Sequence, residues 1–121
     1  MSFQLFNRSF CFLGSHLAAR IDENRLHLRN QNYRDILSRL PFTNNGDNHH
    51  EFDYFFWMGD LNYRIEMPRD NIIQAAESGN YQILLENDQL YREMSYERCF
   101  IEFEEHEINF MPTYRFNRGF T

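Results

Sequence analysis

Two short apolar runs frame the first half of the chain. Residues 9–13 and 54–58 are apolar at nearly every position, which predicts two strands that are covered on both faces of a sheet. Between them, apolar residues recur at helical spacing over 23–40, and Pro41 would end this helix. The polar, turn-rich stretch 43–51 predicts a surface loop. The first half therefore predicts the order strand, helix, loop and strand.

The second half predicts helices followed by a pair of strands. Gly59 ends the second apolar run and is expected to end its strand. The further predicted elements are two helices and the two strands of a hairpin, over residues 69–78, 81–92, 99–103 and 107–111. Pro68 suits the first turn of the first of these helices, and Gly79 suits its C-terminal cap. Strands separated by helices predict an α/β layered fold, and an antiparallel last pair would make the sheet mixed.

The composition favours one folded unit and argues against two classes of function. Of the 121 residues, 42% are hydrophobic and 17% are aromatic, which is too much apolar surface for a disordered chain. The net charge of -6 argues against a nonspecific nucleic-acid binder, since such proteins present a cationic face. No run approaches the roughly 20 apolar residues of a membrane span, and the N-terminus does not resemble a signal peptide. We therefore expect a cytoplasmic protein.

The two cysteines exclude one phosphatase mechanism. Cys11 and Cys99 lie in apolar runs and have no metal-ligand spacing around them, so we expect reduced core residues. A cysteine-based phosphatase of the Cys-x5-Arg type needs an arginine after its thiolate, where this chain has Leu17 and Glu105. Neither cysteine can therefore serve as that nucleophile.

The polar residues that follow the two apolar runs are the candidates for chemistry. Asp60 and Asn62 come directly after the second predicted strand, at the edge where open α/β sheets place their ligands. A carboxylate there can orient or deprotonate a water, and an amide can fix the position of that water or of a phosphate oxygen. Taken alone, Gly-Asp-x-Asn is more often a turn, and His16 after the first strand is more often a packing or capping residue. The consecutive residues His49, His50 and Glu51 could form a metal cluster. This is disfavoured, because they lie in a polar loop, which is usually solvated.

Four longer strings change this balance. Along the chain these are, in order, SHLAAR at 15–20, RNQNYRDIL at 29–37, WMGDLNYRI at 57–65 and PTYRF at 112–116. With these strings the chain resembles the inositol polyphosphate 5-phosphatases, part of the endonuclease, exonuclease and phosphatase superfamily. The resemblance implies a two-sheet β-sandwich flanked by helices, that is, an α/β (α+β) fold. It also implies that residues 1–121 are the central part of a catalytic domain, without the N- and C-terminal portions of that domain.

The resemblance implies catalytic roles for three residues. Asp60 and Asn62 match the pair that orients the attacking water and holds the scissile phosphate. His16 matches a histidine that hydrogen-bonds the 5-phosphate. We interpret Arg29, Asn30 and Asn32, in the third string, as polar helix positions that tie the helix to neighbouring loops.

It also implies three substrate-binding residues. Arg64 is expected to stabilise the site or to contact the headgroup. Tyr114 and Arg115 match a Tyr-Lys pair that recognises the inositol 4-phosphate, but here arginine replaces lysine. This replacement keeps the charge and alters the geometry, because a guanidinium can bind phosphate in a fork where an ammonium acts as a point charge.

The implied reaction is Mg²⁺-dependent hydrolysis of the 5-phosphate of phosphoinositides or inositol polyphosphates, at a peripheral membrane surface and without nucleic acid. The family's metal-binding Asn and Glu and its later Ser-Asp-His string have no counterpart in these residues. We therefore expect the Mg²⁺ ligands to lie mainly outside this chain, and the 121 residues alone to be inactive. The alternatives are a nuclease of the same superfamily, and a catalytically dead interaction module or partial gene product.

Overall fold

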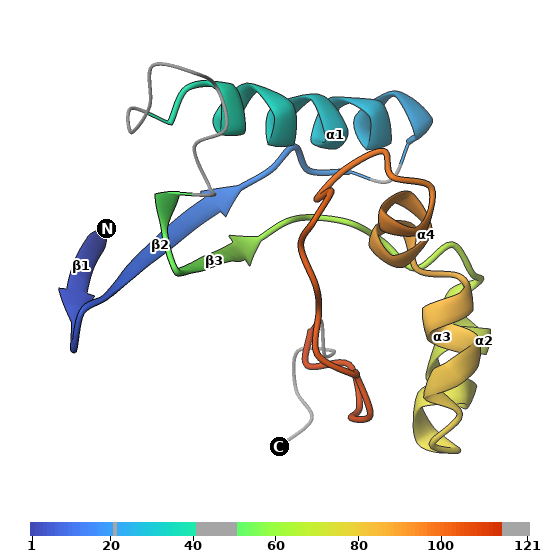
Figure 1. The fold of residues 1–121 in the computed structure, drawn as a ribbon. Coiled ribbons are helices and arrows are strands. Elements are labelled where there is room, and N and C mark those ends of the chain that lie inside the picture. The colour runs from blue at the N-terminus through green and yellow to red at the C-terminus, as the bar shows by residue number, and fades with distance from the viewer. Residues whose placement is uncertain (21, 41–50, 115–121) are drawn as a thin grey trace. The chain divides into compact units, whose positions relative to one another are not determined.

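The computed structural model describes residues 1–20, 22–40 and 51–114. The chain divides into two compact units, Met1–Tyr63 and Arg64–Thr121. The first contains a sheet and one long helix, and the second contains three short helices (Figure 1). Each unit is described by itself below.

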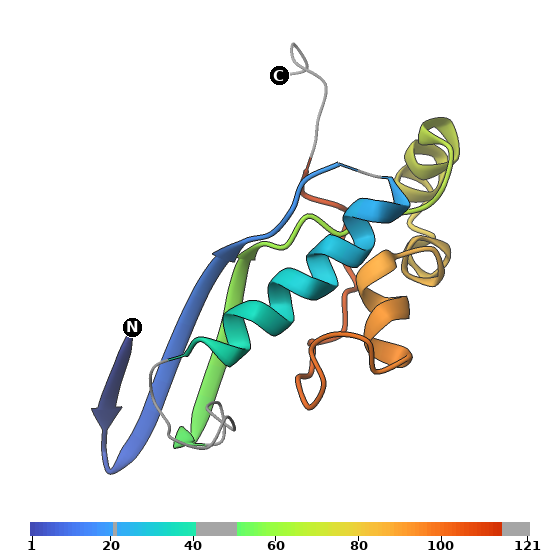
Figure 2. The same ribbon diagram turned by 90° about the horizontal axis from the view of Figure 1, so that it is seen from above.

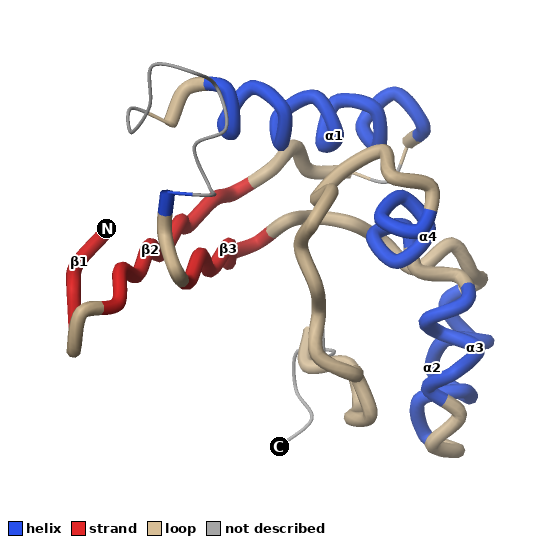
Figure 3. Tube along the Cα trace, viewed as in Figure 1, coloured by secondary structure: helices blue, strands red, loops and turns tan. Residues whose placement is uncertain are grey.

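The first unit is built on a mixed sheet of three strands, drawn in red in Figure 3. Its strands are β1 (Ser2–Leu5), β2 (Arg8–His16) and β3 (Tyr54–Asp60), in that order. β1 pairs antiparallel with β2, and β2 pairs parallel with β3. The two predicted strands are confirmed, although both extend further than the apolar runs.

β1 was not predicted from the sequence. It is joined to β2 by the two residues Phe6 and Asn7, whose φ values are 47° and 61°. Two-residue hairpin loops favour such left-handed residues, and asparagine tolerates them well. Asn7 was the one local signal for this hairpin.

Asp53 joins the beginnings of β2 and β3. Its carboxylate accepts hydrogen bonds from the Ser9 backbone N–H at 2.7 Å, from the Ser9 hydroxyl at 2.9 Å and from the Arg8 guanidinium at 3.1 Å. The hydrogen bonds from Ser9, followed by that from Arg8, hold the pKa of Asp53 below its usual value. This fixes the register at the end of the sheet opposite to the candidate site.

Helix α1 (Glu23–Ser38) confirms the predicted helix over 23–40. Its N-cap is Asp22, whose side chain accepts the backbone N–H of Arg25 at 3.0 Å. The helix runs alongside β2 and β3 in both views (Figures 1 and 2). The rings of Tyr33 and Trp57 meet there at 5.3 Å, so this face of the sheet is covered.

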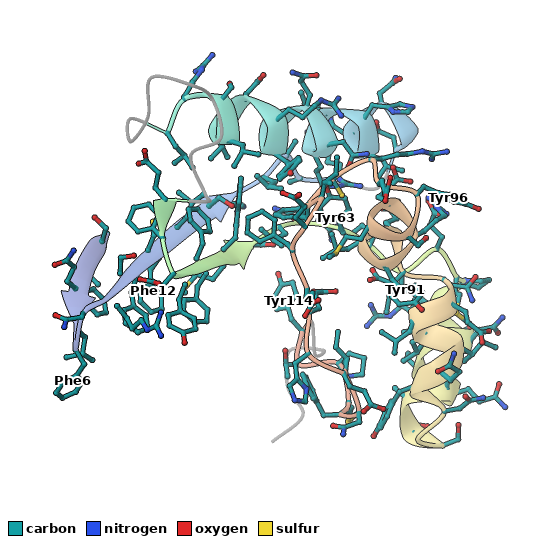
Figure 4. All side chains as sticks on the ribbon, in the orientation of Figure 1. Phe6, Phe12, Tyr63, Tyr91, Tyr96 and Tyr114 are labelled. Carbon is teal, nitrogen blue, oxygen red and sulfur yellow. The ribbon has the colours of Figure 1, made fainter. Side chains whose placement is uncertain are left out.

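The opposite face of the sheet carries a continuous row of aromatic rings. The stacked pairs, with centroids 4.9–5.8 Å apart, are Phe3–Phe10, Phe3–Phe12, Phe10–Tyr54 and Phe12–Phe56. Phe12 is labelled in Figure 4. Phe3, Tyr54 and Phe56 are each more than 40% exposed. The apolar character of both faces was therefore predicted correctly, and one face stays uncovered by the described residues.

The second unit contains α2 (Arg69–Glu77), α3 (Tyr81–Glu86) and α4 (Gln89–Ser95). α2 confirms the predicted helix over 69–78, with Gly79 at φ +72° just beyond its cap. The single helix predicted over 81–92 is wrong, because the chain turns at Asn87 and Asp88. Asp88 then caps α4 by accepting the backbone N–H groups of Leu90 and Tyr91.

The hairpin predicted over 99–111 is also wrong. The described backbone there consists of turns and irregular structure, with Phe100 and Glu102 at φ 49° and 67°. Left-handed residues at alternate positions interrupt the extended conformation that a strand needs. The sheet is nevertheless mixed, because of β1 rather than because of this segment.

Two polar side chains of α4 are buried. Gln89 and Glu93 are each 1% exposed. Gln89 donates to Glu66 at 2.8 Å, and Glu93 accepts from Arg98 at 3.3 Å. These partners offset the cost of burying polar groups.

Two further predictions concern the core and membranes. Cys11 and Cys99 are buried free thiols, as expected, and burial raises the pKa of Cys11. Among the described residues, no helix has the length and apolar character needed to span a bilayer.

Candidate active site

The C-terminal ends of β2 and β3 bring His16 and Asp60 together. These residues are directly opposed in the parallel register of the two strands. His16 Nε2 lies 3.7 Å from Asp60 Oδ2, and the two side chains are 74% and 65% exposed. The sequence placed each of them after an apolar run, and the structure shows that they share one edge of the sheet.

Three hydrogen bonds join Asn62, Leu17 and Asp60 at the same edge. Its backbone N–H donates to Asp60 Oδ1 at 3.1 Å, and its Nδ2 donates to the Leu17 carbonyl at 2.9 Å. The Leu17 N–H in turn donates to the Asp60 carbonyl at 3.0 Å. The structure thus joins Asp60 and Asn62 through the Asn62 backbone, and the Asn62 carboxamide is bonded to Leu17, in the segment that follows His16.

Asn62 adopts a left-handed conformation, with φ +60°. Asparagine is among the few residues that reach this region at small cost. The turn directs its carboxamide back to Leu17, while Asp60 remains at the end of β3. Asparagine is thus suited to this turn.

Gly59 allows β2 and β3 to approach at the site. It was expected to end the strand, but it lies within β3 and pairs with Ser15. Its φ is +128°, and a Cβ atom there would lie 2.0 Å from the Ser15 carbonyl oxygen. Only glycine fits this position without displacing the segment that carries His16 and Asp60.

α1 holds the segments that follow both strands. Arg29 donates to the carbonyls of Ala18 and Arg20, at 3.2 and 2.7 Å. Asn32 Oδ1 accepts the Ala18 N–H at 3.1 Å. The interpretation of Arg29 and Asn32 as residues that tie the helix to a loop is confirmed.

Tyr63 extends this support to the segment after β3, and sequence reasoning did not single it out. Its hydroxyl donates to Asn30 Oδ1 at 2.7 Å, which confirms the predicted role of Asn30. The Arg29 guanidinium lies 5.3 Å from the centre of the Tyr63 ring. The signal for Tyr63 was its place next to Asn62, within the string WMGDLNYRI.

The predicted substrate-binding residues belong to the second unit. The Arg64 N–H donates to Gln89 Oε1 at 3.0 Å, and the Arg64 carbonyl accepts the Gln89 N–H at 2.9 Å. Tyr114 is 78% exposed (labelled in Figure 4), and Arg115 lies outside the described residues. The roles of Arg64, Tyr114 and Arg115 in binding substrate remain predictions.

The described residues do not form a complete metal site. Mg²⁺ is bound by about six oxygen ligands, of which the Asp60 carboxylate could supply one. In residues 1–20, 22–40 and 51–114 no group of three His, Cys, Asp or Glu side chains could hold a metal ion. His49 and His50 lie outside these ranges. What the edge itself provides is a carboxylate, an imidazole and a carboxamide that together can bind and polarise a phosphate ester and a water.

Comparison with known proteins agrees with this geometry. Residues 1–121 match the profile of the endonuclease/exonuclease/phosphatase family 2. The chain is 38% identical to synaptojanin-2 of Rattus norvegicus over 117 residues, covering 97% of this chain and 8% of that protein. It is 42% identical to phosphatidylinositol 3,4,5-trisphosphate 5-phosphatase 1 of Mus musculus over 128 residues, covering 98% of this chain and 10% of that protein.

A solved structure shows the same fold. It is the inositol polyphosphate 5-phosphatase domain of SpSynaptojanin in complex with inositol (1,4)-bisphosphate and a calcium ion, with a TM-score of 0.86 and 35% identity. The match covers 98% of this chain and 34% of that chain. The predicted α/β fold and the resemblance drawn from the four strings are confirmed. The chain spans about a third of the solved domain and about a tenth of the two full-length relatives.

Proposed function

Because the chain belongs to the endonuclease/exonuclease/phosphatase family 2, we propose that it takes part in hydrolysing the 5-phosphate of phosphoinositides or inositol polyphosphates. The observation that carries this proposal is the single edge that joins His16, Asp60 and Asn62. The named relatives are 5-phosphatases or synaptojanins, and the solved structure is a 5-phosphatase domain with an inositol bisphosphate.

The residues at this edge divide the chemistry between them. A water attacks the phosphorus of the 5-phosphate, a bond forms between the water oxygen and phosphorus, and the bond from phosphorus to the ring oxygen breaks. The Asp60 carboxylate orients this water and accepts its proton, while the Asn62 carboxamide fixes the position of the reacting group. His16 donates a hydrogen bond to a phosphoryl oxygen as negative charge builds there. The ring oxygen leaves with a proton taken from solvent.

Three further features belong to this proposal. The reaction requires Mg²⁺, with most ligands outside the described residues. The substrate is presented at a membrane surface on the cytoplasmic side or as a soluble headgroup, with Arg64, Tyr114 and Arg115 binding its phosphates. A nuclease activity is disfavoured, because a net charge of -6 opposes binding to a nucleic-acid backbone.

The choice of substrate tests the proposal. The full-length protein is incubated with Mg²⁺ and vesicles of phosphatidylinositol 4,5-bisphosphate, or with inositol 1,4,5-trisphosphate, and phosphate release is measured. We expect release from these compounds and none from their counterparts that lack the 5-phosphate, and a chelator should abolish it. Equal release from both sets, or cleavage of DNA instead, would contradict the proposal.

His16 provides a matched pair of variants for the same assay. His16→Ala should lower kcat strongly, because a contact that strengthens in the transition state acts on the chemical step. His27→Ala changes an exposed histidine of α1 and should leave the rate unchanged. A His16→Ala effect confined to KM would remove His16 from the chemical step.

A further inference from the structure

Arg29 is the most deeply buried charged residue of the first unit, with an exposure of 0%. Arginine is almost never fully buried unless it is paired, so its contacts indicate what the position is for. The guanidinium donates to the carbonyls of Ala18 and Arg20 and faces the ring of Tyr63. These partners belong to two different loops, one after β2 and one after β3.

Each of these loops carries part of the candidate active site. The loop after β2 begins directly after His16 and includes Leu17, whose carbonyl accepts the Asn62 carboxamide. The loop after β3 places Tyr63 directly after Asn62. Two partners of Arg29 are therefore close in sequence to the groups that are proposed to handle the phosphate: Ala18 is two residues from His16, and Tyr63 is one residue from Asn62.

The site needs such a support. The side chains of His16 and Asp60 are mostly exposed, so packing does not hold them. Asn62 sits at φ +60°, a conformation that its neighbours must maintain. The position of a side chain that is not packed is set by its own backbone. Here the backbone that follows His16 is hydrogen-bonded to α1.

We propose that Arg29 is a positioning residue for this site. It holds the loops after β2 and β3 at a fixed separation, so that His16, Asp60 and Asn62 keep one arrangement. Asn32 and Asn30 assist it, through the Ala18 N–H and the Tyr63 hydroxyl. The expected effect of Arg29 on turnover rests on the proposed function. Its expected effect on the conformation of Asn62 does not.

The geometry of the guanidinium makes a specific prediction. Its Nη1 atom donates to both carbonyls while the group faces the Tyr63 ring. Arg29→Lys keeps the positive charge, but the lysine side chain is shorter and lacks the planar group, so it cannot reach both carbonyls and face the ring in the same way. The loops should then shift, and small displacements of reacting groups cost roughly 10- to 100-fold in rate. We expect kcat to fall by that factor while KM stays within about twofold, because Arg29 does not touch substrate.

The matched control is Arg34→Lys. Arg34 is an exposed residue of the same helix and bonds Gln31 within it. Its substitution should leave kcat, KM and the melting temperature unchanged. A loss of activity as large as that of Arg29→Lys would show that the effect is not specific to Arg29.

A second readout does not depend on activity. The Cα and Cβ chemical shifts of Asn62, measured by NMR in full-length protein labelled at asparagine, report its left-handed conformation. Arg29→Lys should move these shifts and Arg34→Lys should not. If the wild-type protein releases no phosphate, the proposed function fails, but the shifts still decide this inference.

A third pair covers the case in which Arg29→Lys does not fold. Asn32→Ala removes the acceptor of the Ala18 N–H and keeps the guanidinium, while Asn32→Asp retains that acceptor. We expect Asn32→Ala to move the Asn62 shifts and lower kcat, and Asn32→Asp to restore both. If Arg29→Lys folds, unchanged Asn62 shifts in that variant would overturn the proposal. If Arg29→Lys does not fold, unchanged Asn62 shifts in Asn32→Ala would overturn it.

Discussion

At the scale of single residues, the candidate site depends on backbone as much as on side chains. His16 and Asp60 meet because the strands that carry them are in register. Asn62 is oriented by the Leu17 carbonyl and by the Asp60 carboxylate. Gly59 permits this approach because it has no Cβ atom.

Gly59→Ala should therefore destabilise the protein and impair the site together. The new methyl group would meet the Ser15 carbonyl, and alanine would be strained at φ +128°. We expect a loss of about 2–4 kcal/mol in the free energy of unfolding, measured by urea denaturation of the full-length protein. Gly14→Ala is the matched control, since a Cβ atom at Gly14 meets nothing within 4 Å. Equal stability of the two variants would contradict this role of Gly59.

The positions of the candidate residues were easier to predict from the sequence than the groups that support them. His16, Asp60 and Asn62 stand in short strings directly after apolar runs, which placed them at the ends of strands, while their catalytic roles came from the resemblance and remain predictions. The Leu17 carbonyl has no sequence signature, because every residue carries one. Gly59 was misjudged as the end of a strand, since glycine also occurs inside strands where another backbone comes close.

At the scale of elements, long periodic segments were predicted well and breaks within them were not. α1 matches its apolar stripe, and α2 matches its proline and glycine boundaries. α3 and α4 were merged, because the apolar spacing continues across Asn87 and Asp88. The sequence Asn-Asp is a typical helix start, and Asp88 does cap α4.

The cap offers a prediction about stability and pH. Burial raises the pKa of Asp88 above its ordinary value, although the N–H groups of Tyr91 and Leu90 act in the opposite direction. Asp88→Asn keeps an acceptor for these groups and removes the half-buried charge. It should be at least as stable as the wild type at neutral pH, whereas Asp88→Ala should lose about 1 kcal/mol.

The pH dependence has a definite sign. A carboxyl group whose pKa is raised by folding binds its proton more tightly in the native state, so the wild type gains stability as pH falls through the raised value toward about 3.9. Any advantage of Asp88→Asn should therefore shrink in acid. Urea denaturation of the wild type and of Asp88→Asn, between neutral and acid pH, measures this difference in stability. An advantage of Asp88→Asn that grows in acid would contradict the account.

The prediction of a C-terminal hairpin was wrong for a related reason. Residues 99–111 alternate in polarity as a strand pair would, but the left-handed Phe100 and Glu102 break the extended backbone. Cys99 and Phe100 are buried all the same, at 0% and 5% exposure. Ile101, Phe110 and Met111 of the same segment are exposed, so polarity indicated burial only in part, and tertiary packing decided the conformation.

At the scale of the whole molecule, the first unit has one face of its sheet covered by α1 and one aromatic face exposed. The apolar runs require cover on both faces, and the described residues supply it on one. The chain spans about a third of the solved domain that it matches. The proposed activity is accordingly one for the full-length protein, in which the edge of β2 and β3 supplies His16, Asp60 and Asn62.

The carboxylate of Asp60 tests this central claim most directly. Asp60→Asn keeps the size of the side chain and an acceptor for the Asn62 N–H, but it cannot accept a proton from water. In the full-length protein with Mg²⁺ and phosphatidylinositol 4,5-bisphosphate, we expect kcat to fall roughly 100- to 10,000-fold, with the melting temperature unchanged. The control Asp70→Asn alters an exposed carboxylate at the start of α2 and should retain full activity. Turnover of Asp60→Asn within a few-fold of the wild type would contradict the account.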